Sequence, residues 1–343
     1  LRLGTVELCQ GGAAHGVVNS MVTLVSRHRT LSHLKGLTNA VLRKVAAQGP
    51  EAWDALRAPR LPKWLRGPLS EAWGSDAMAA MEQAHSAGAP LDLTAKGDPA
   101  ALAEAVGGTL LPTGSVRVVE AGQVSTMPGF EAGDWWVQDA AAALPVKVLA
   151  PQAGERVLDL CAAPGGKTLQ LAAAGAEVTA VDLSAPRLQR VKENLARTGL
   201  KAKTLNKDAR AVSGSFDAIL LDAPCSATGT IRRHPDLPYA KDGSEFGALI
   251  ELQSELIDHA WSLLAPGGRL IFCTCSLLPD EGEVQVDEAL ERHQDMTVDR
   301  AALDLPGVEA DWQTGEGGLR LRPDYWAERG GMDGFYIACL RKG

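Results

Sequence analysis

Two cysteines stand directly after apolar segments of the chain. Cys225 follows the sequence LLDAP, and Cys275 lies in the short motif TCS. A thiolate is a soft nucleophile that adds readily to carbon 6 of a cytosine ring, and this addition makes carbon 5 nucleophilic enough to accept a methyl group. A carboxyl group at ring nitrogen 3 would stabilise the adduct. The two cysteines therefore indicate methylation of a pyrimidine ring carbon.

The other cysteines have a simpler interpretation. A buried cysteine commonly serves as a small apolar side chain, which suffices for Cys9, Cys273 and Cys339. A chain of 343 residues can bury a sizeable core without disulfides, and this one has no C-x2-C pair typical of zinc sites. We therefore expect free thiols, no metal and a reducing compartment, the cytoplasm.

A turn of small residues follows a third apolar segment and indicates a cofactor site. Backbone N–H groups in such a turn, at the start of a helix, can approach a ligand closely. The spacing matches neither the G-x-G-x-x-G fingerprint nor the P-loop. A strand–helix turn without a ligand is the alternative interpretation. The turn comprises Cys161, Ala162, Ala163, Pro164, Gly165, Gly166 and Lys167.

Acidic residues stand at or just after the ends of the next two predicted strands. Asp182 is placed to bind both ribose hydroxyls of a nucleoside, and Asp208 to accept a hydrogen bond from an adenine amino group. A phosphate group would meet like charge at these positions. The series therefore predicts an adenosine cofactor that lacks a phosphate.

Strands alternate with helices after residue 150. The predicted strands are 156–161, 178–183, 203–206, 217–222 and 269–276, and the predicted helices are about 167–174, 186–198, 245–264 and 280–293. This alternation predicts right-handed crossovers and a mostly parallel sheet, closed by a strand at 334–340 paired with 319–322. Ligands bind beyond the carboxyl ends of such strands, so Cys225 and Cys275 are expected to face one cleft beside the cofactor.

The amino-terminal part of the chain is basic and has a helical pattern. Residues 1–75 contain ten Lys and Arg against four Asp and Glu, a net charge of +6, whereas the remainder has a net charge of −14. Apolar residues recur there at helical spacing, and Gly49-Pro50 is expected to end one helix. A solvated surface explains the charge equally well, but a basic module also suits docking of a polyanion.

The composition is that of a globular protein. Hydrophobic residues make up 45% and charged residues 22% of the chain, which excludes a largely disordered or collagen-like protein. No apolar run approaches the roughly 18 residues of a membrane helix, so no membrane association is expected. The chain begins with Leu1 and shows no signal-peptide pattern, and its natural amino terminus is expected to lie upstream.

Five segments form a recognisable family pattern. They are GDWWVQDAAAALP at 133–145, VLDLCAAPGGKT at 157–168, DAILLDAPCSATGTIRRHPD at 217–236, LAPGGRLIFCTCSLLPDEGE at 264–283 and DGFYIACLRK at 333–342. With them the chain resembles the Sun/nucleolar-protein family of S-adenosylmethionine-dependent RNA cytosine-5 methyltransferases, and within it the branch that acts on bacterial small-subunit (16S) rRNA. The resemblance covers roughly residues 130–343.

The resemblance implies an overall architecture. We expect an α/β fold of the class I S-adenosylmethionine methyltransferase type, which is Rossmann-like with a mostly parallel seven-stranded sheet, and an N-terminal all-helical RNA-binding domain. That helical, antitermination-factor-like domain is expected at 1–75, with its opening helices upstream of Leu1. A linker and small α+β region is expected at 76–145, and the catalytic domain at 146–343. The implied partner is RNA, small-subunit rRNA above all, and the implied state is a monomer.

The resemblance also implies roles for individual residues. Cys275 is expected to be the nucleophile, and Cys225 to assist product release. Asp222 is expected to address the target base, and Lys167 to organise that side of the site. The implied S-adenosylmethionine contacts are Cys161, Ala162, Ala163, Pro164, Gly165, Gly166, Lys167, Asp182, Asp208 and Asp222.

Two further segments bear on RNA binding. Arg232 and Arg233 are expected to contact RNA phosphates together with the basic residues of 1–75; the alternatives are a surface pair or ion pairs with the protein's own carboxylates. The family often has a Leu-Arg-Val-Asn-like stretch where this chain has LDLT at 91–94. RNA contacts are therefore not carried over to that stretch.

Several rival functions have discriminating features. A DNA cytosine-5 methyltransferase would use Cys225 as the nucleophile and would not need the TCS motif or the basic helical module. An NAD-dependent oxidoreductase would need the missing glycine fingerprint. A non-catalytic rRNA-binding or antitermination factor would not need two intact cysteine motifs. Transfer RNA in place of rRNA as the substrate remains open at this stage.

Overall fold

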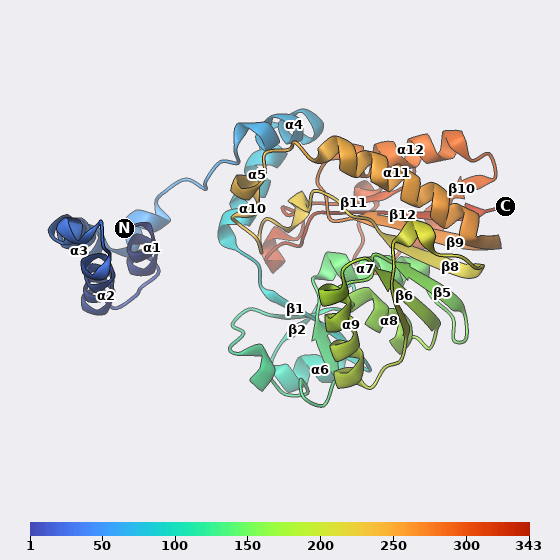
Figure 1. The fold of residues 1–343 in the computed structure, drawn as a ribbon, viewed down its shortest axis with the longest axis horizontal. Coiled ribbons are helices and arrows are strands. Elements are labelled where there is room, and N and C mark those ends of the chain that lie inside the picture. The colour runs from blue at the N-terminus through green and yellow to red at the C-terminus, as the bar shows by residue number, and fades with distance from the viewer. The chain divides into compact units, whose positions relative to one another are not determined.

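The structure is a computed structural model that describes residues 1–343, with the side chain of Asp54 left out. The chain forms two compact units, Leu1–Pro59 and Arg60–Gly343 (Figure 1).

The first unit consists of helices. They are α1 (Arg2–Cys9), α2 (Ala14–Arg27) and α3 (Lys35–Asp54). Their apolar faces meet in a small core of Leu8, Val17, Val18 and Leu42, as the helical spacing of apolar residues predicts. Inside α3 the backbone of Gly49 leaves the helical conformation, with φ 72° and ψ 175°, so the helix is interrupted at the predicted Gly49-Pro50 position.

The next two helices, α4 (Lys63–Trp73) and α5 (Ser75–Ala87), belong to the second unit. Leu65 and Leu69 of α4 are fully buried in a cluster that also contains Ile231 and Leu277. The helical region expected at 1–75 therefore spans the division between the units, because the apolar face of α4 packs on residues far along the chain.

A small antiparallel sheet follows. Its strands are β1 (Leu91–Ala95), β2 (Thr109–Leu110), β3 (Val116–Val118) and β4 (Trp135–Val137), in the order β2-β3-β1-β4, with α6 (Pro99–Val106) beside them. The fully buried Trp135 packs with Leu93 and Val116 in its core. This sheet and α6 lie within residues 76–145, for which a linker and small α+β region is predicted.

The large sheet has the strand order β10-β12-β9-β8-β5-β6-β7, and β11 pairs with β12 as an eighth strand. The strands are β5 (Arg156–Leu160), β6 (Glu177–Asp182), β7 (Lys203–Asn206), β8 (Phe216–Asp222), β9 (Leu264–Thr274), β10 (Met296–Val298), β11 (Leu319–Leu321) and β12 (Phe335–Lys342). Strands β5, β6, β7, β8 and β9 pair in parallel and β11 pairs with β12, as predicted, while β12 also pairs antiparallel to β9. Strand β9 begins at Leu264 rather than Arg269, because Leu264 pairs with Phe216 before a bulge shifts the register.

Helices cover both faces of this sheet (Figure 1). They are α7 (Ala140–Leu149), α8 (Gly166–Ala173), α9 (Ala185–Thr198), α11 (Phe246–Leu263) and α12 (Glu283–Arg292), whereas the short α10 (Leu237–Ala240) packs through Leu237 with α4 and α5. Val157 and Leu220 face a core shared with α7, whereas Leu158 and Ile219 face a core shared with α11. Strands buried on both faces explain why the sequence shows continuous apolar runs here rather than alternation.

The strand order reverses at β5, since β6 lies on one side of it and β8 on the other. Crevices form at such reversals beyond the carboxyl ends of the strands. The cofactor turn after β5 and the two cysteine segments after β8 and β9 are all at this edge.

Candidate active site

The turn after β5 depends on left-handed backbone conformations at two positions and on a hydrogen bond to the end of the neighbouring strand β6. Cys161 (φ 60°) and Gly165 (φ 108°) adopt left-handed backbone conformations between β5 and α8. A side chain at Gly165 would also lie 3.1 Å from Val191 of α9, so this position needs glycine. The N–H of Ala163 donates to the Asp182 carboxylate over 3.0 Å, which links the turn to the end of β6.

A cavity of about 410 Å³ opens beside this turn. The predicted site residues that line it are Ala162, Ala163, Pro164, Gly166, Lys167, Asp222, Cys275 and Arg233. The predicted site residues outside its lining are Cys161, Gly165, Asp182, Asp208, Cys225 and Arg232. The structure therefore gathers the turn, one cysteine and the Lys167–Asp222 pair around a single space of the size that small ligands occupy.

Two acidic residues expected to bind an adenosine cofactor, Asp182 and Asp208, lie outside the lining of this cavity. Asp182 is nearly fully buried and accepts the N–H groups of Ala163 and Ser184, at 3.0 and 2.8 Å. Two lone-pair positions of its carboxylate stay available for ribose hydroxyls. Asp208 lies outside the lining and is bound to Arg210 over 2.8 Å at the surface. Its expected adenine contact stays a prediction.

The two cysteine segments converge at the ends of β8 and β9. These strands are parallel neighbours, with Asp222 opposite Cys273 in the register. The sulfur atoms of Cys225 and Cys275 consequently lie 3.5 Å apart, across 50 residues of sequence. The two sulfurs thus lie together, but only Cys275 lines the cavity, so the expectation that both cysteines face one cleft beside the cofactor stays a prediction for Cys225. Cys273 is fully buried, with its sulfur 3.6 Å from the Asp222 carboxylate.

The two half-buried thiols have different surroundings. The contact with Cys275, followed by burial, raises the pKa of the Cys225 thiol well above its usual value. Cys225 therefore stays protonated at neutral pH. Cys275 instead lines the cavity, together with the cations Lys167 and Arg233.

Lys167 and Asp222 form an ion pair over 2.8 Å in the wall of the cavity. Burial lowers the pKa of Lys167, but the adjacent Asp222 carboxylate outweighs it and leaves the pKa raised. The ammonium group also lies 5.0 Å from the ring centroid of Phe335. A charged lysine thus fixes the Asp222 carboxylate in place beside Cys275.

Arg232 and Arg233 are adjacent in sequence but have separate environments. The Arg232 side chain is fully buried and donates to Asp139 over 2.9 Å and to the carbonyl of Gly330 over 2.7 Å. The prediction that Arg232 contacts an RNA phosphate is therefore wrong, because its guanidinium is enclosed by the protein's own hydrogen-bond acceptors. Arg233 pairs with Asp333 over 2.6 Å, yet 42% of its side chain is exposed at the cavity.

Sequence reasoning missed several residues of the cavity wall, among them Arg187, His234 and Phe335. Phe335 follows the Asp-Gly pair that opens the last strand, in a segment already recognised as part of the family pattern, so its signal was present. Arg187 is bound to the carbonyl of Ala163 in the cofactor turn, a contact that no local pattern announces.

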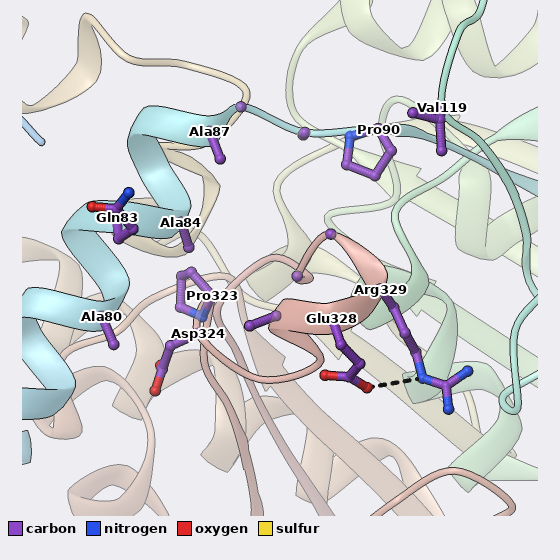
Figure 2. Close-up of a pocket in the computed structure, with 15 residues that line it drawn as sticks. Ala80, Gln83, Ala84, Ala87, Pro90, Val119, Pro323, Asp324, Glu328 and Arg329 are labelled. Carbon is purple, nitrogen blue, oxygen red and sulfur yellow. Dashed lines mark hydrogen bonds and ion pairs between the residues drawn. The ribbon is translucent and has the colours of Figure 1, made fainter. Parts of the chain in front are cut away.

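A larger cavity, of about 660 Å³, lies elsewhere in the second unit. Figure 2 shows Ala80, Ala84 and Ala87 of α5 on one side of it, and Glu328 and Arg329 on the other. Its lining contains no cysteine and none of the predicted site residues. The smaller cavity is therefore the candidate active site.

Two absences apply to the described residues. None of their helices is both long and apolar enough to cross a membrane. No group of three or more His, Cys, Asp or Glu side chains among them is arranged to hold a metal ion.

Comparisons with known proteins agree with this geometry. Residues 146–341 match the family described as 16S rRNA methyltransferase RsmB/F. The chain is 37% identical to ribosomal RNA small subunit methyltransferase B of Erwinia tasmaniensis, over 95% of this chain and 80% of the relative. It is 39% identical to the protein of the same name from Vibrio cholerae, over 90% of this chain and 73% of the relative.

Solved structures show the same fold. A methyltransferase homologue from Pyrococcus horikoshii, 27% identical, superposes with a TM-score of 0.65 over 81% of this chain and 94% of that one. The structure described as NSun6 from the same organism with SFG, 20% identical, superposes with a TM-score of 0.71 over 82% and 98%. The expected class I S-adenosylmethionine methyltransferase fold is confirmed. The chain is thus a methyltransferase and belongs to the 16S rRNA methyltransferase RsmB/F family.

Proposed function

We propose that this protein methylates carbon 5 of a cytosine in 16S rRNA, with S-adenosylmethionine as the cofactor and a covalent cysteine–cytosine intermediate. The observation that supports this best is the pair of thiols 3.5 Å apart, beside a cavity walled by the cofactor turn. The names of the relatives from Erwinia and Vibrio favour small-subunit rRNA over tRNA as the substrate.

The residues proposed to hold the cofactor are those of the turn, Cys161 to Lys167, with Asp182, Asp208 and Asp222. S-adenosylmethionine, when bound, supplies an electrophilic methyl group. Asp182 is proposed to bind the ribose hydroxyls with its remaining lone pairs, while the helix start at Gly166 presents backbone N–H groups.

Cys275 is proposed to begin the reaction on the base. Cys275 lines the cavity together with Lys167 and Arg233, so its sulfur borders the space proposed for the base. Its sulfur forms a bond to carbon 6 of cytosine, and the electron pair of the carbon 5–carbon 6 double bond moves onto carbon 5. Asp222, held by Lys167, is proposed to stabilise the adduct at ring nitrogen 3.

Cys225 is proposed to complete the reaction. Once carbon 5 has gained its methyl group, its proton passes to water, and the electron pair of that C–H bond restores the double bond between carbons 5 and 6. The bond between Cys275 and carbon 6 breaks, and its electron pair returns to the Cys275 sulfur. Cys225 lies beside Cys275 but outside the cavity lining, and its raised pKa keeps it protonated. That position suits assistance in release rather than the initial attack.

RNA docking is proposed for the basic first unit and for Arg233. Arg233 already pairs with the protein's own Asp333, which matches one of the alternatives, but the exposed 42% of its side chain also leaves it accessible to a phosphate. We also propose that the protein acts as a monomer, without a metal ion, in the cytoplasm.

The test is incubation of the full chain with S-adenosylmethionine labelled in the methyl group and with small-subunit rRNA, large-subunit rRNA or tRNA. We expect label only in small-subunit rRNA, and one cytosine there that resists bisulfite conversion. Label found only in tRNA would show that tRNA, and not rRNA, is the substrate. RNA binding without any label would favour the rival, a non-catalytic rRNA-binding factor.

A further inference from the structure

We propose that Glu281 is a positioning residue that holds the two cysteine loops together, an inference that rests on the proposed function of Cys225 and Cys275. The Cys225 loop is defined here as residues 224–228 and the Cys275 loop as residues 275–278. Glu281 lies in a short 3-10 helix, Pro279–Glu281, between β9 and α12. It touches neither the cavity nor the thiols as a hydrogen-bond partner.

The Glu281 carboxylate is fully buried and binds both loops at once. One oxygen, Oε1, accepts the backbone N–H of Ser226 over 2.8 Å. The other, Oε2, accepts the hydroxyls of Ser226 and Ser276, at 2.5 and 2.6 Å. Ser226 directly follows Cys225 and Ser276 directly follows Cys275. One side chain therefore fixes the residue next to each catalytic sulfur.

A second contact extends this hold to the residue before Cys225. The side-chain N–H group of Gln253 donates to Glu281 Oε1 over 3.1 Å and to the carbonyl of Pro224 over 2.8 Å. Gln253 is itself fully buried on α11. Cys225 is thus fixed on both sides, through Pro224 and through Ser226.

Direct bonds between the loops complete the arrangement. The hydroxyls of Ser226 and Ser276 are 3.1 Å apart, and Thr228 accepts the backbone N–H of Leu277 over 2.9 Å. All of these groups are fully buried. A buried hydroxyl needs a partner, so this cluster has one low-energy arrangement when a carboxylate accepts from its centre.

The expected consequence is control of the distance between the two thiols. Without the carboxylate, the N–H of Ser226 and the hydroxyls of Ser226 and Ser276 lose their acceptor, and the loops must shift to satisfy these groups. Catalysis depends on reacting atoms held in line, and a misplacement of 1 Å by a remote change costs about 100-fold in rate. A shift of either loop would therefore reduce turnover.

Two conservative variants separate reach from charge. Glu281→Gln keeps the length of the side chain, and serine hydroxyls can reverse their bonds to accept from the new amide. Glu281→Asp keeps the charge but shortens the side chain by one methylene. Positioning predicts that Glu281→Gln stays close to wild type and that Glu281→Asp and Glu281→Ala are both impaired.

The first readout does not depend on methylation. Diamide, an oxidant, removes one hydrogen from each of two neighbouring thiols and joins the sulfurs, so the rate of Cys225–Cys275 disulfide formation reports their proximity. We expect this rate, followed by peptide mass spectrometry, to fall in Glu281→Asp and Glu281→Ala and to persist in Glu281→Gln. The second readout is kcat for rRNA methylation, expected to fall about 100-fold in the impaired variants with KM unchanged.

Glu82→Ala is the matched control. Glu82 is a buried glutamate that accepts the backbone N–H of Leu61 over 2.9 Å and makes no hydrogen bond to either cysteine loop, although Leu61 packs in one cluster with Leu277. It should lower the melting temperature without changing the disulfide rate or kcat. If Glu281→Asp and Glu281→Ala behave in the same way as this control, Glu281 is only structural and the proposal is overturned.

An equal loss of kcat and of disulfide rate in Glu281→Gln and Glu281→Asp would also overturn the proposal, because the length of the side chain alone would then not be sufficient to hold the loops. Should Glu281→Ala fail to fold, the Gln and Asp variants still decide. The two proposals can fail separately. If Glu281→Asp and Glu281→Ala form the disulfide more slowly than wild type, but the wild type itself transfers no methyl group, the positioning role is supported and the proposed function is contradicted.

Discussion

The sulfur atoms of Cys225 and Cys275 lie 3.5 Å apart because β8 and β9 are parallel neighbours in the large sheet. Parallel strands present their carboxyl ends at the same edge, so residues that follow these two strands meet without any local sequence signal linking them. The same edge carries the cofactor turn after β5. The topology thus brings thiols and cofactor site together before any side-chain detail is considered.

Asp182→Ala should weaken S-adenosylmethionine binding by on the order of 1–3 kcal/mol, because hydrogen bonds to a carboxylate are lost and the N–H groups of Ala163 and Ser184 are left unpaired. Isothermal titration calorimetry measures this. Asp217→Ala is the control, since Asp217 pairs with Arg156 at the surface and outside the cavity. Equal affinities of both variants and wild type would remove Asp182 from the site.

Arg232→Ala and Arg233→Ala should have different consequences. Loss of Arg232 leaves the buried Asp139 without its cation, although Asp333 keeps Arg233, and should lower the free energy of unfolding by about 3–5 kcal/mol. Arg233→Ala should lower RNA affinity and reduce the dependence of binding on salt by about one phosphate contact. Urea denaturation and salt titrations separate the two. A stable Arg232→Ala protein with weakened RNA binding would restore the phosphate role that the buried geometry argues against.

Stability should depend on Asp159 between about pH 4 and pH 7. Burial raises the pKa of this carboxyl from its usual 3.8 to about 7. The folded chain therefore retains a proton that the unfolded chain has released, and the free energy of unfolding falls as pH rises through this range. Asp159→Asn stays neutral, so its stability relative to wild type should increase by roughly 1.4 kcal/mol for each pH unit. Urea denaturation at several pH values measures this, and a constant difference would contradict a raised pKa.

Deletion of residues 1–59 should weaken rRNA binding and flatten its salt dependence, since fewer counterions are released on binding. The cut belongs after Pro59 because α4 packs inside the second unit. S-adenosylmethionine binding by the shortened chain serves as the control for folding. Full rRNA affinity after the deletion would contradict a docking role for the first unit.

The sequence was sufficient for the parts of the fold that depend on continuous patterns. Apolar runs such as 217–222 predict strands, and parallel strands place Asp222, Cys225 and Cys275 at one edge. Small residues at 161–166 predict the cofactor turn, because few other residues permit such a close reversal.

Contacts between distant polar residues could not be predicted. Arg232 is enclosed by Asp139 and Asp333, which are 93 and 101 residues away in the chain, so its basic side chain resembled a phosphate ligand. Glu281 lies within the recognised segment 264–283, but its role could not be predicted because its partners belong to two separate loops. The boundary of the first unit was obscured because α4 has the same helical pattern as the helices before it.

The most direct test of the proposed mechanism uses the two cysteine variants on one denaturing gel, with S-adenosylmethionine and a small-subunit rRNA fragment. Cys225→Ala should methylate the base but fail to release it, and so accumulate a protein–RNA band held by a covalent thioether. Cys275→Ala should give neither methylation nor that band, because no sulfur remains to add to carbon 6. A band in Cys275→Ala with none in Cys225→Ala would contradict the assignment, and normal turnover in both variants would contradict covalent catalysis by these cysteines.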